Sequence, residues 1–224
     1  MGLNKINKPE PLAKMALNAL RNSILANELT TDKVYNEKSL AETLGISRTP
    51  VREALLELSS KRLIKFLPQK GVVINTFSNK EIEDVFEIRT ALESFSISKV
   101  CLNYKTMNTS LLKKSLVNQK NAAGLKDYTA FMGADRSFHL GFSKLTGNNY
   151  LMDMMKDIRD IMHLMGFRAL GVKGRMQKVV KEHECLLKAV EKGNISDALE
   201  QIECHLEASK EAVKEIIKLE GKNA

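Results

Sequence analysis

The stretch Leu40-Ala-Glu-Thr-Leu-Gly-Ile-Ser-Arg-Thr-Pro-Val-Arg-Glu-Ala-Leu55 decides the fold of the N-terminal third of this 224-residue chain. Asn36 can cap a short helix that ends at Gly45, a residue that tolerates the left-handed backbone of a tight turn. Ser47 can cap the next helix, and Pro50 falls in its first turn, where a missing backbone N–H costs nothing. A short helix, a glycine turn and a second capped helix predict a helix-turn-helix.

The segments on either side extend this motif to a winged helix. Apolar residues recur every three or four positions from Pro11 to Asn27, which predicts an amphipathic helix. Downstream, β-rich runs at 63–67 and 72–75 flank the turn Pro68-Gln-Lys-Gly71, a pattern typical of a β-hairpin. We therefore predict a winged-helix domain over residues 1–76.

The remaining residues, 77–224, predict only helices. Ser78 and Glu81 have the spacing of a capping box and open a long helix. Further helical stretches follow at 109–123, 128–146, 148–167, 172–192 and 195–219, with breaks at Gly124, Gly147, Gly171 and Gly193-Asn194. An aromatic content of 5%, 4 prolines and the absence of tryptophan favour helices over a β-sandwich or barrel. We expect a mainly α protein with an N-terminal winged helix-turn-helix and a C-terminal all-α bundle.

Composition also bears on the compartment. The sequence has no run of 18 apolar residues, which excludes a membrane span, and residues 1–9 lack an apolar stretch of signal-peptide length. The cysteines, Cys101, Cys185 and Cys204, are odd in number and have no CxxC spacing, so we expect buried thiols in a reducing compartment. These features predict a cytoplasmic protein.

Basic charge is concentrated toward the N-terminus. The formal net charge is +8, and residues 1–76 hold 12 Lys and Arg against 7 Asp and Glu. Arg48 and Arg52 are four residues apart, so they share the helix face opposite the apolar stripe. Ser47 and Thr49 lie beside them at a helix N-terminus, which favours a phosphate, while the arginines can pair bidentately with guanine. A solvated helix face could carry the same arginines, but the turn before them and the wing after them favour double-stranded DNA as the partner.

The string Ser47-Arg-Thr-Pro-Val-Arg-Glu-Ala-Leu55 resembles the DNA-binding domain of the GntR family of bacterial transcription regulators. The flanking residues Leu40–Ile46 and Pro68–Val73 share the resemblance. It implies operator contacts by the residues Lys38, Arg48, Thr49 and Arg52, and entry of the wing tip, Lys70-Gly71, into the minor groove.

Two departures from that family concern turns. Asn27 and the pair Thr31-Asp32 stand where the family usually has glycine, and Arg62 replaces the glycine that follows the recognition-helix segment. Asn and Asp tolerate turn geometry better than Arg does, so Arg62 is the departure that most affects its turn.

Three of the four histidines form a pattern in the second domain. Asp135 and His139 are spaced i, i+4 on one expected helix, so their side chains leave the same face. His183 lies ten residues before Gly193 and His205 twelve residues after it, so an antiparallel helix pair would bring both imidazoles to nearly the same height. Each histidine alone could be an ordinary core or surface residue. Together the four side chains are a plausible set for one divalent ion such as zinc, nickel or manganese.

The second domain resembles the all-helical C-terminal ligand domain (FCD) of the FadR-type branch of the GntR family. The residues that carry the resemblance are Phe138-His139, Gly147-Asn148, Glu182-His183, Ala189, Gly193, Ala198 and His205-Leu206. In metal-containing members one Asp and three His bind the ion, and Asp135, His139, His183 and His205 match them. The resemblance thus implies a metal site at these four residues.

These observations predict a homodimeric, metabolite-responsive transcription regulator, a repressor in our interpretation. An ion with open positions suits a small organic acid effector, and Arg89 is the first candidate to bind its carboxylate, ahead of Arg136 and Arg159. The alternative is a helical metallohydrolase with a DNA-binding appendage, which would use the ion to activate water. A non-specific DNA-packaging protein would leave the second domain without a role.

Overall fold

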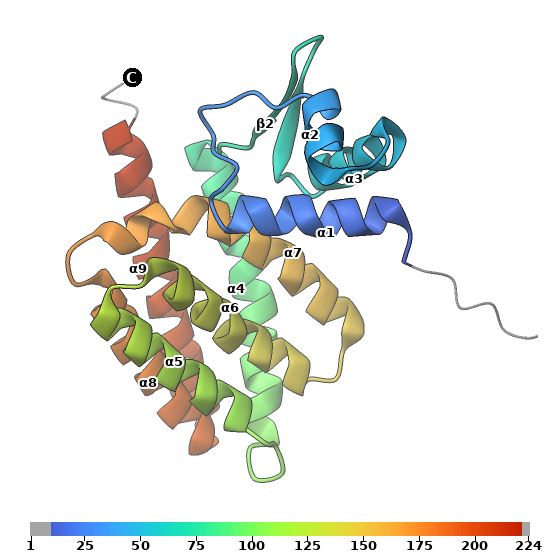
Figure 1. Cartoon of the computed structure of the whole chain (residues 1–224). Coiled ribbons are helices and arrows are strands. Elements are labelled where there is room, and N and C mark those ends of the chain that lie inside the picture. Colours follow the sequence, from blue (N-terminus) through green and yellow to red (C-terminus); the bar gives the residue numbers. More distant parts are fainter. Residues whose placement is uncertain (1–9, 221–224) are drawn as a thin grey trace, which may run out of the picture. The chain divides into compact units, whose positions relative to one another are not determined.

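A computed structural model describes residues 10–220. Residues 1–9, where we expected no signal peptide, and residues 221–224 lie outside the described part. The chain divides into two compact units, of which the first ends at Thr76 and the second begins at Phe77. Helices and one small hairpin make up the described secondary structure, so the expected fold class, mainly α with a winged helix-turn-helix, is confirmed (Figure 1).

The first unit is built around the helix that carries the deciding stretch. Its elements are α1 (Leu12–Leu25), α2 (Glu37–Leu44), α3 (Arg48–Ser60), β1 (Ile64–Leu67) and β2 (Gly71–Ile74). Helices α1 and α2 both pack on α3, whose Val51 and Leu55 are buried. The Asn36 side chain accepts a hydrogen bond from the Ser39 amide at 2.7 Å, and Gly45 ends α2 with φ of +65°. Ser47 occupies the N-cap position of α3, but within the described chain its hydroxyl makes no capping bond, contrary to expectation.

The wing pairs β1 with β2 in antiparallel register, with Ile64 opposite Ile74. Tyr35 adds a bridge to Val72 on the other edge of β2. This bridge brings the Tyr35 carbonyl oxygen to 2.2 Å from where a Cβ on Gly71 would lie, and Gly71 has φ of +129°. Glycine is therefore required there by both space and backbone conformation.

The second unit contains six α-helices and a 3₁₀ turn among the residues described. They are α4 (Asn79–Leu102), α5 (Ser110–Leu125), α6 (Tyr128–Leu145), α7 (Asn149–Gly166), a 3₁₀ helix (Arg168–Gly171), α8 (Arg175–Glu191) and α9 (Ile195–Glu220). Ser78 and Glu81 form the expected capping box of α4. Helix α4 packs mainly against α9 and α6, while α5 packs against α6 and α8 (Figure 1).

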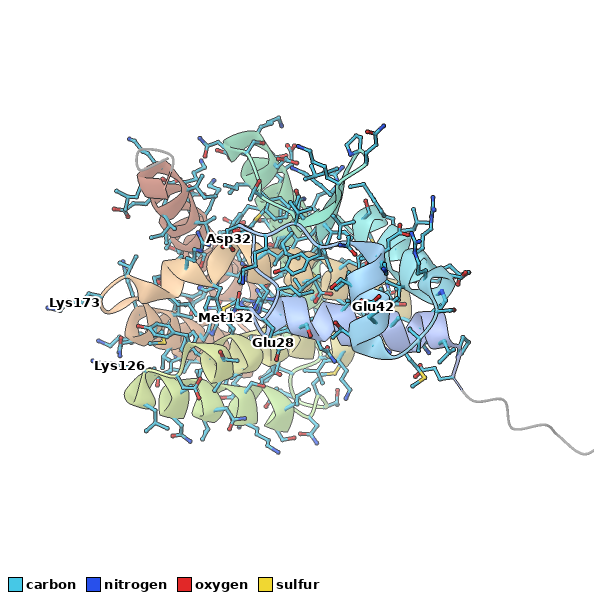
Figure 2. All side chains as sticks on the ribbon, turned by 45° about the horizontal axis from the view of Figure 1, so that its top comes forward. Glu28, Asp32, Glu42, Lys126, Met132 and Lys173 are labelled. Carbon is cyan, nitrogen blue, oxygen red and sulfur yellow. The ribbon has the colours of Figure 1, made fainter. Side chains whose placement is uncertain are left out.

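Three further local expectations were wrong. Gly124 does not break α5, which continues to Leu125 and ends where Lys126 adopts φ of +57°. Helix α8 begins at Arg175 rather than at residue 172, after the loop that contains Lys173. The side chains of Lys126 and Lys173 extend outward from the second unit (Figure 2). Of the cysteines, only Cys101 is buried, because Cys185 and Cys204 lie on the outer faces of α8 and α9.

Across residues 10–220, none of the helices has the combined length and apolar character needed to cross a membrane.

Candidate metal centre and DNA-reading face

The residues predicted to read DNA lie on the surface of the first unit. Ser47, Arg48, Thr49 and Arg52 are exposed at the N-terminal half of α3, and Lys38 is exposed on α2. Arg48 lies 3.7 Å from Glu37, a contact between an exposed guanidinium and a half-buried carboxylate that solvent screens. Lys70 is exposed in the wing turn, whereas Gly71 is half-buried and allows the close approach of Tyr35.

The four predicted metal ligands come from three helices and meet inside the second unit. Asp135 and His139 lie on α6, His183 on α8 and His205 on α9. One nitrogen of each histidine lies within 4.8 Å of the corresponding nitrogens of the other two. The Nε2 atoms of His183 and His205 are 3.3 Å apart, and Asp135 Oδ1 is 3.7 Å from His139 Nε2 and 3.9 Å from His183 Nε2. All four side chains are buried, so one small volume is surrounded by three imidazoles and a carboxylate.

The outer nitrogen of each imidazole has its own hydrogen-bond acceptor. The Nδ1 atom of His139 lies 2.5 Å from a Glu93 carboxylate oxygen, that of His183 lies 2.9 Å from Gln119 Oε1, and that of His205 lies 2.7 Å from Glu182 Oε2. Since these oxygens can only accept, each Nδ1 carries a proton and donates it. In the neutral rings the lone pair therefore stands on Nε2, which faces the centre.

Each carboxylate around the centre is paired with an arginine. Arg159 donates to Asp135, and Arg175 Nη1 donates to Glu182 at 2.7 Å. Arg89 Nε donates to Glu93 at 2.7 Å, and its Nη2 lies 3.1 Å from His139 Nε2.

The charges around the centre set the protonation of its groups. Burial lowers the pKa of both His139 and His183 well below the ordinary value, and nearby arginines lower that of His139 further. Burial acts to raise the pKa of Asp135, but the charges of Arg159, Arg89 and the two neighbouring histidines together outweigh it, so the pKa falls. At neutral pH His139 and His183 thus offer neutral imidazoles and Asp135 offers an ionised carboxylate, which are the forms that bind a metal ion.

A cavity of about 50 Å³ opens beside the centre. The centre's Asp135 and His205 line it together with Arg89, Arg159 and Arg175, and much of the remaining wall is apolar. Two of the arginines considered from sequence, Arg89 and Arg159, are therefore at this cavity, whereas Arg136 pairs with Asp160 at 2.5 Å.

Several residues around the centre were missed in the sequence. Glu93 lies four residues after Arg89 on one helix, a spacing that could have identified it as the ion-pair partner of Arg89. Glu182 was named only as part of the family resemblance, and Gln119 and Arg175 carry no comparable signal, because their role depends on how α5 and α8 pack against the other helices.

The donor set fits a divalent transition metal. Three imidazole nitrogens and one carboxylate oxygen are donors that zinc, nickel and manganese accept, and hydrogen-bonded outer nitrogens are typical of metal-binding histidines.

Known families match both units. Residues 12–74 match the family described as bacterial regulatory proteins, gntR family, and residues 84–208 match the FCD domain. This chain belongs to the GntR family, with an FCD domain as its second unit. The GntR match contains every residue predicted to read DNA, and the FCD match contains the four predicted metal ligands.

Similar proteins agree with this assignment. The GntR chain is 26% identical to the HTH-type transcriptional regulator YdhC of Bacillus subtilis (strain 168), across 97% of each chain. It is 25% identical to the gluconate operon transcriptional repressor of Bacillus licheniformis, across 76% of this chain and 72% of that one. Among solved structures, Escherichia coli McbR/YncC has a TM-score of 0.81 at 19% identity and covers 93% of this chain and 100% of its own.

The protein is thus a DNA-binding transcription regulator of the GntR family, a family whose helix-turn-helix binds operator DNA. Both matched families and the two Bacillus relatives are regulators rather than enzymes, and they do not support the hydrolase alternative.

Proposed function

We propose that this regulator is a homodimeric repressor in the cytoplasm that holds one divalent metal ion at Asp135, His139, His183 and His205. In this proposal a small carboxylate binds beside the ion and changes operator affinity. The single observation that carries the proposal is the three imidazoles whose Nε2 atoms face one point while their Nδ1 atoms are tied to Glu93, Gln119 and Glu182.

The imidazole geometry favours a cation over a purely structural cluster. The Nε2 atoms of His183 and His205 are 3.3 Å apart, and in the neutral form of each ring, with the proton on Nδ1, Nε2 is the acceptor nitrogen. Two lone pairs at that distance repel each other unless a positive centre lies between or beside them, and leaving buried polar atoms unsatisfied is unfavourable. A bound divalent ion would satisfy both and would offer its remaining positions to oxygen ligands.

The cavity supports a small anion as the effector. Arg89, Arg159 and Arg175 bring three guanidinium groups to a space of about 50 Å³. Such a space has room for about three water-sized spheres, so it suits a carboxylate of few atoms. Arg89 is the arginine that contacts His139 Nε2 directly, so a cation on that nitrogen would repel its guanidinium toward the cavity.

One face of α4 supports a second copy of the chain as the partner. Ile88, Phe95 and Leu102 are 51%, 54% and 71% exposed, and their seven-residue spacing places them on one stripe. Acidic Glu87 lies beside the start of this stripe, and basic Lys99 lies near its end. An antiparallel pairing of two α4 helices would therefore match apolar with apolar and acidic with basic side chains, as a two-fold interface requires.

Thermal unfolding of chelator-treated protein with a panel of short carboxylic acids tests the sensor. We expect the responding acid to raise the unfolding temperature only when zinc, nickel or manganese is also present, and to change operator affinity. Arg89→Lys keeps the positive charge but loses the bidentate geometry, so it should weaken the response to the acid without removing the response to metal. A shift of equal size without metal would contradict a metal-anchored effector.

A further inference from the structure

Gln119 is the buried side chain on α5 that touches two of the proposed ligands at once. It is 0% exposed. Its carbonyl oxygen accepts from His183 Nδ1 at 2.9 Å, and its amide nitrogen donates to Asp135 Oδ1 at 3.3 Å. Helix α5 supplies none of the four proposed ligands, yet this one amide joins a ligand on α6 to a ligand on α8.

The chemistry of the two neighbours requires an amide at this position. His183 Nδ1 donates and Asp135 is ionised, so the residue between them must accept at one end and donate at the other. A carboxylate could accept from His183 but would place a second negative charge against Asp135. An apolar side chain could do neither. The reversed amide would set its oxygen against the Asp135 carboxylate, so the neighbours also fix which way Gln119 points.

The Asp135 carboxylate is held from both sides. Arg159 donates to Oδ2, and Gln119 donates to Oδ1, the oxygen nearest to the imidazole nitrogens of His139 and His183. Gln119 thus controls the direction of Oδ1 and the tautomer of His183 together.

We propose that Gln119 is the positioning residue of the metal centre: it locks His183 in the Nδ1–H tautomer and aims Asp135 Oδ1 at the same point. The expected effect on metal affinity rests on the proposed function, but the tautomer of His183 is a property of the protein without metal. The other two histidines have carboxylate acceptors, so His183 is the ligand whose partner contributes no charge.

Two substitutions separate the two roles of the amide. Gln119→Met has a similar shape and removes both the acceptor and the donor. Gln119→Glu keeps the acceptor for His183 and loses the donor to Asp135. Gln177→Met is the matched control, because the Gln177 amide also links α8 to α5, through the Ala123 carbonyl at 3.3 Å, outside the metal centre.

Imidazole nitrogen NMR of the chelator-treated protein measures the tautomer without any metal, with the His183 signal assigned by its loss in His183→Asn. We expect the Nδ1–H form in the wild type, in Gln119→Glu and in Gln177→Met, and an increased Nε2–H population in Gln119→Met. A Gln119→Met spectrum identical to that of the wild type would overturn the inference. If Gln119→Met does not fold, the Gln119→Glu spectrum decides: loss of the Nδ1–H form of His183 in that variant would overturn the inference.

Metal titration of the same proteins gives the second readout. We expect Gln119→Met to bind zinc about 10- to 100-fold more weakly than the wild type, as for other lost partners of metal-binding histidines, and Gln177→Met to bind normally. Equal affinity in wild type and Gln119→Met would contradict the positioning role. If the wild type itself binds no metal, the proposed function fails, while the NMR result still decides whether Gln119 sets the tautomer.

Discussion

At the scale of single residues, the predicted DNA-reading residues on α3 have exposed side chains. Arg48 and Arg52 are exposed on α3, whereas Val51 and Leu55 are buried, so the packing of the helix does not depend on the arginines. Their substitution should therefore change DNA binding without changing the fold.

Arg48→Ala and Arg52→Ala should each weaken binding to the operator by about 1–3 kcal/mol, because each removes a guanidinium from the reading face. Fluorescence anisotropy on a duplex selected from random sequences measures this effect. Lys14→Ala, on the exposed face of α1, is the control and should bind normally. Unchanged affinity in both arginine variants would show that another surface reads the DNA.

The buried histidines predict a pH dependence of stability in the metal-free protein. The pKa of His139 and of His183 is lowered in the folded state, so below about pH 6.5 the unfolded chain binds more protons than the folded one. The free energy of unfolding should therefore fall as the pH drops from 7 to 5, by up to about 1.4 kcal/mol per pH unit for each histidine. Denaturant unfolding in chelator measures the slope, and His183→Asn should reduce it by about half. A flat profile would mean that these histidines are protonated in the fold.

At the scale of elements, the wing depends on one glycine. Gly71→Ala should destabilise the first unit by about 1–3 kcal/mol, because a Cβ would meet the Tyr35 carbonyl oxygen and the backbone conformation is unfavourable for alanine. Differential scanning calorimetry measures the change. Gly124→Ala is the matched control, since it lies inside α5 with open space around it and should be neutral or slightly stabilising. If the Gly71→Ala variant unfolds at the same temperature as the wild type, the close approach of Tyr35 to Gly71 does not stabilise the first unit.

Most elements could be predicted from sequence because local signals mark them. Asn36, Gly45 and Ser78 fixed helix ends through caps and turns, and apolar spacing fixed the helix faces. The prediction that Gly124 ends α5 was wrong, because glycine weakens a helix but does not end it when the residues on both sides continue the helical pattern. Helix α5 ends where Lys126 adopts a left-handed backbone conformation, and a lysine side chain gives no sequence signal for that conformation.

The centre was predictable only in part, for a physical reason. The i, i+4 pair and the symmetric spacing about Gly193 pointed to the residues Asp135, His139, His183 and His205. Their partners come from other helices: Glu93 from α4, Gln119 from α5 and Arg159 from α7. No spacing within one helix encodes such contacts, because they arise only when the helices pack.

At the scale of the whole molecule, the α4 stripe predicts the oligomeric state. Phe95→Glu should convert the proposed dimer into a monomer, because it places a charge in the middle of the apolar stripe. Analytical ultracentrifugation measures the mass. Leu125→Glu, at an 81% exposed position at the end of α5, is the control and should leave the dimer intact. A Phe95→Glu protein that remains dimeric would place the interface elsewhere.

The metal content of the whole chain tests the proposed sensor most directly. Chelator-treated protein is titrated calorimetrically with zinc, nickel and manganese. We predict one equivalent per chain for at least one of these ions in the wild type and in His163→Asn, the histidine outside the centre, and none in the double variant His183→Asn, His205→Asn. A wild type that binds none of the three, or a double variant that retains a full equivalent, would contradict the proposed metal centre.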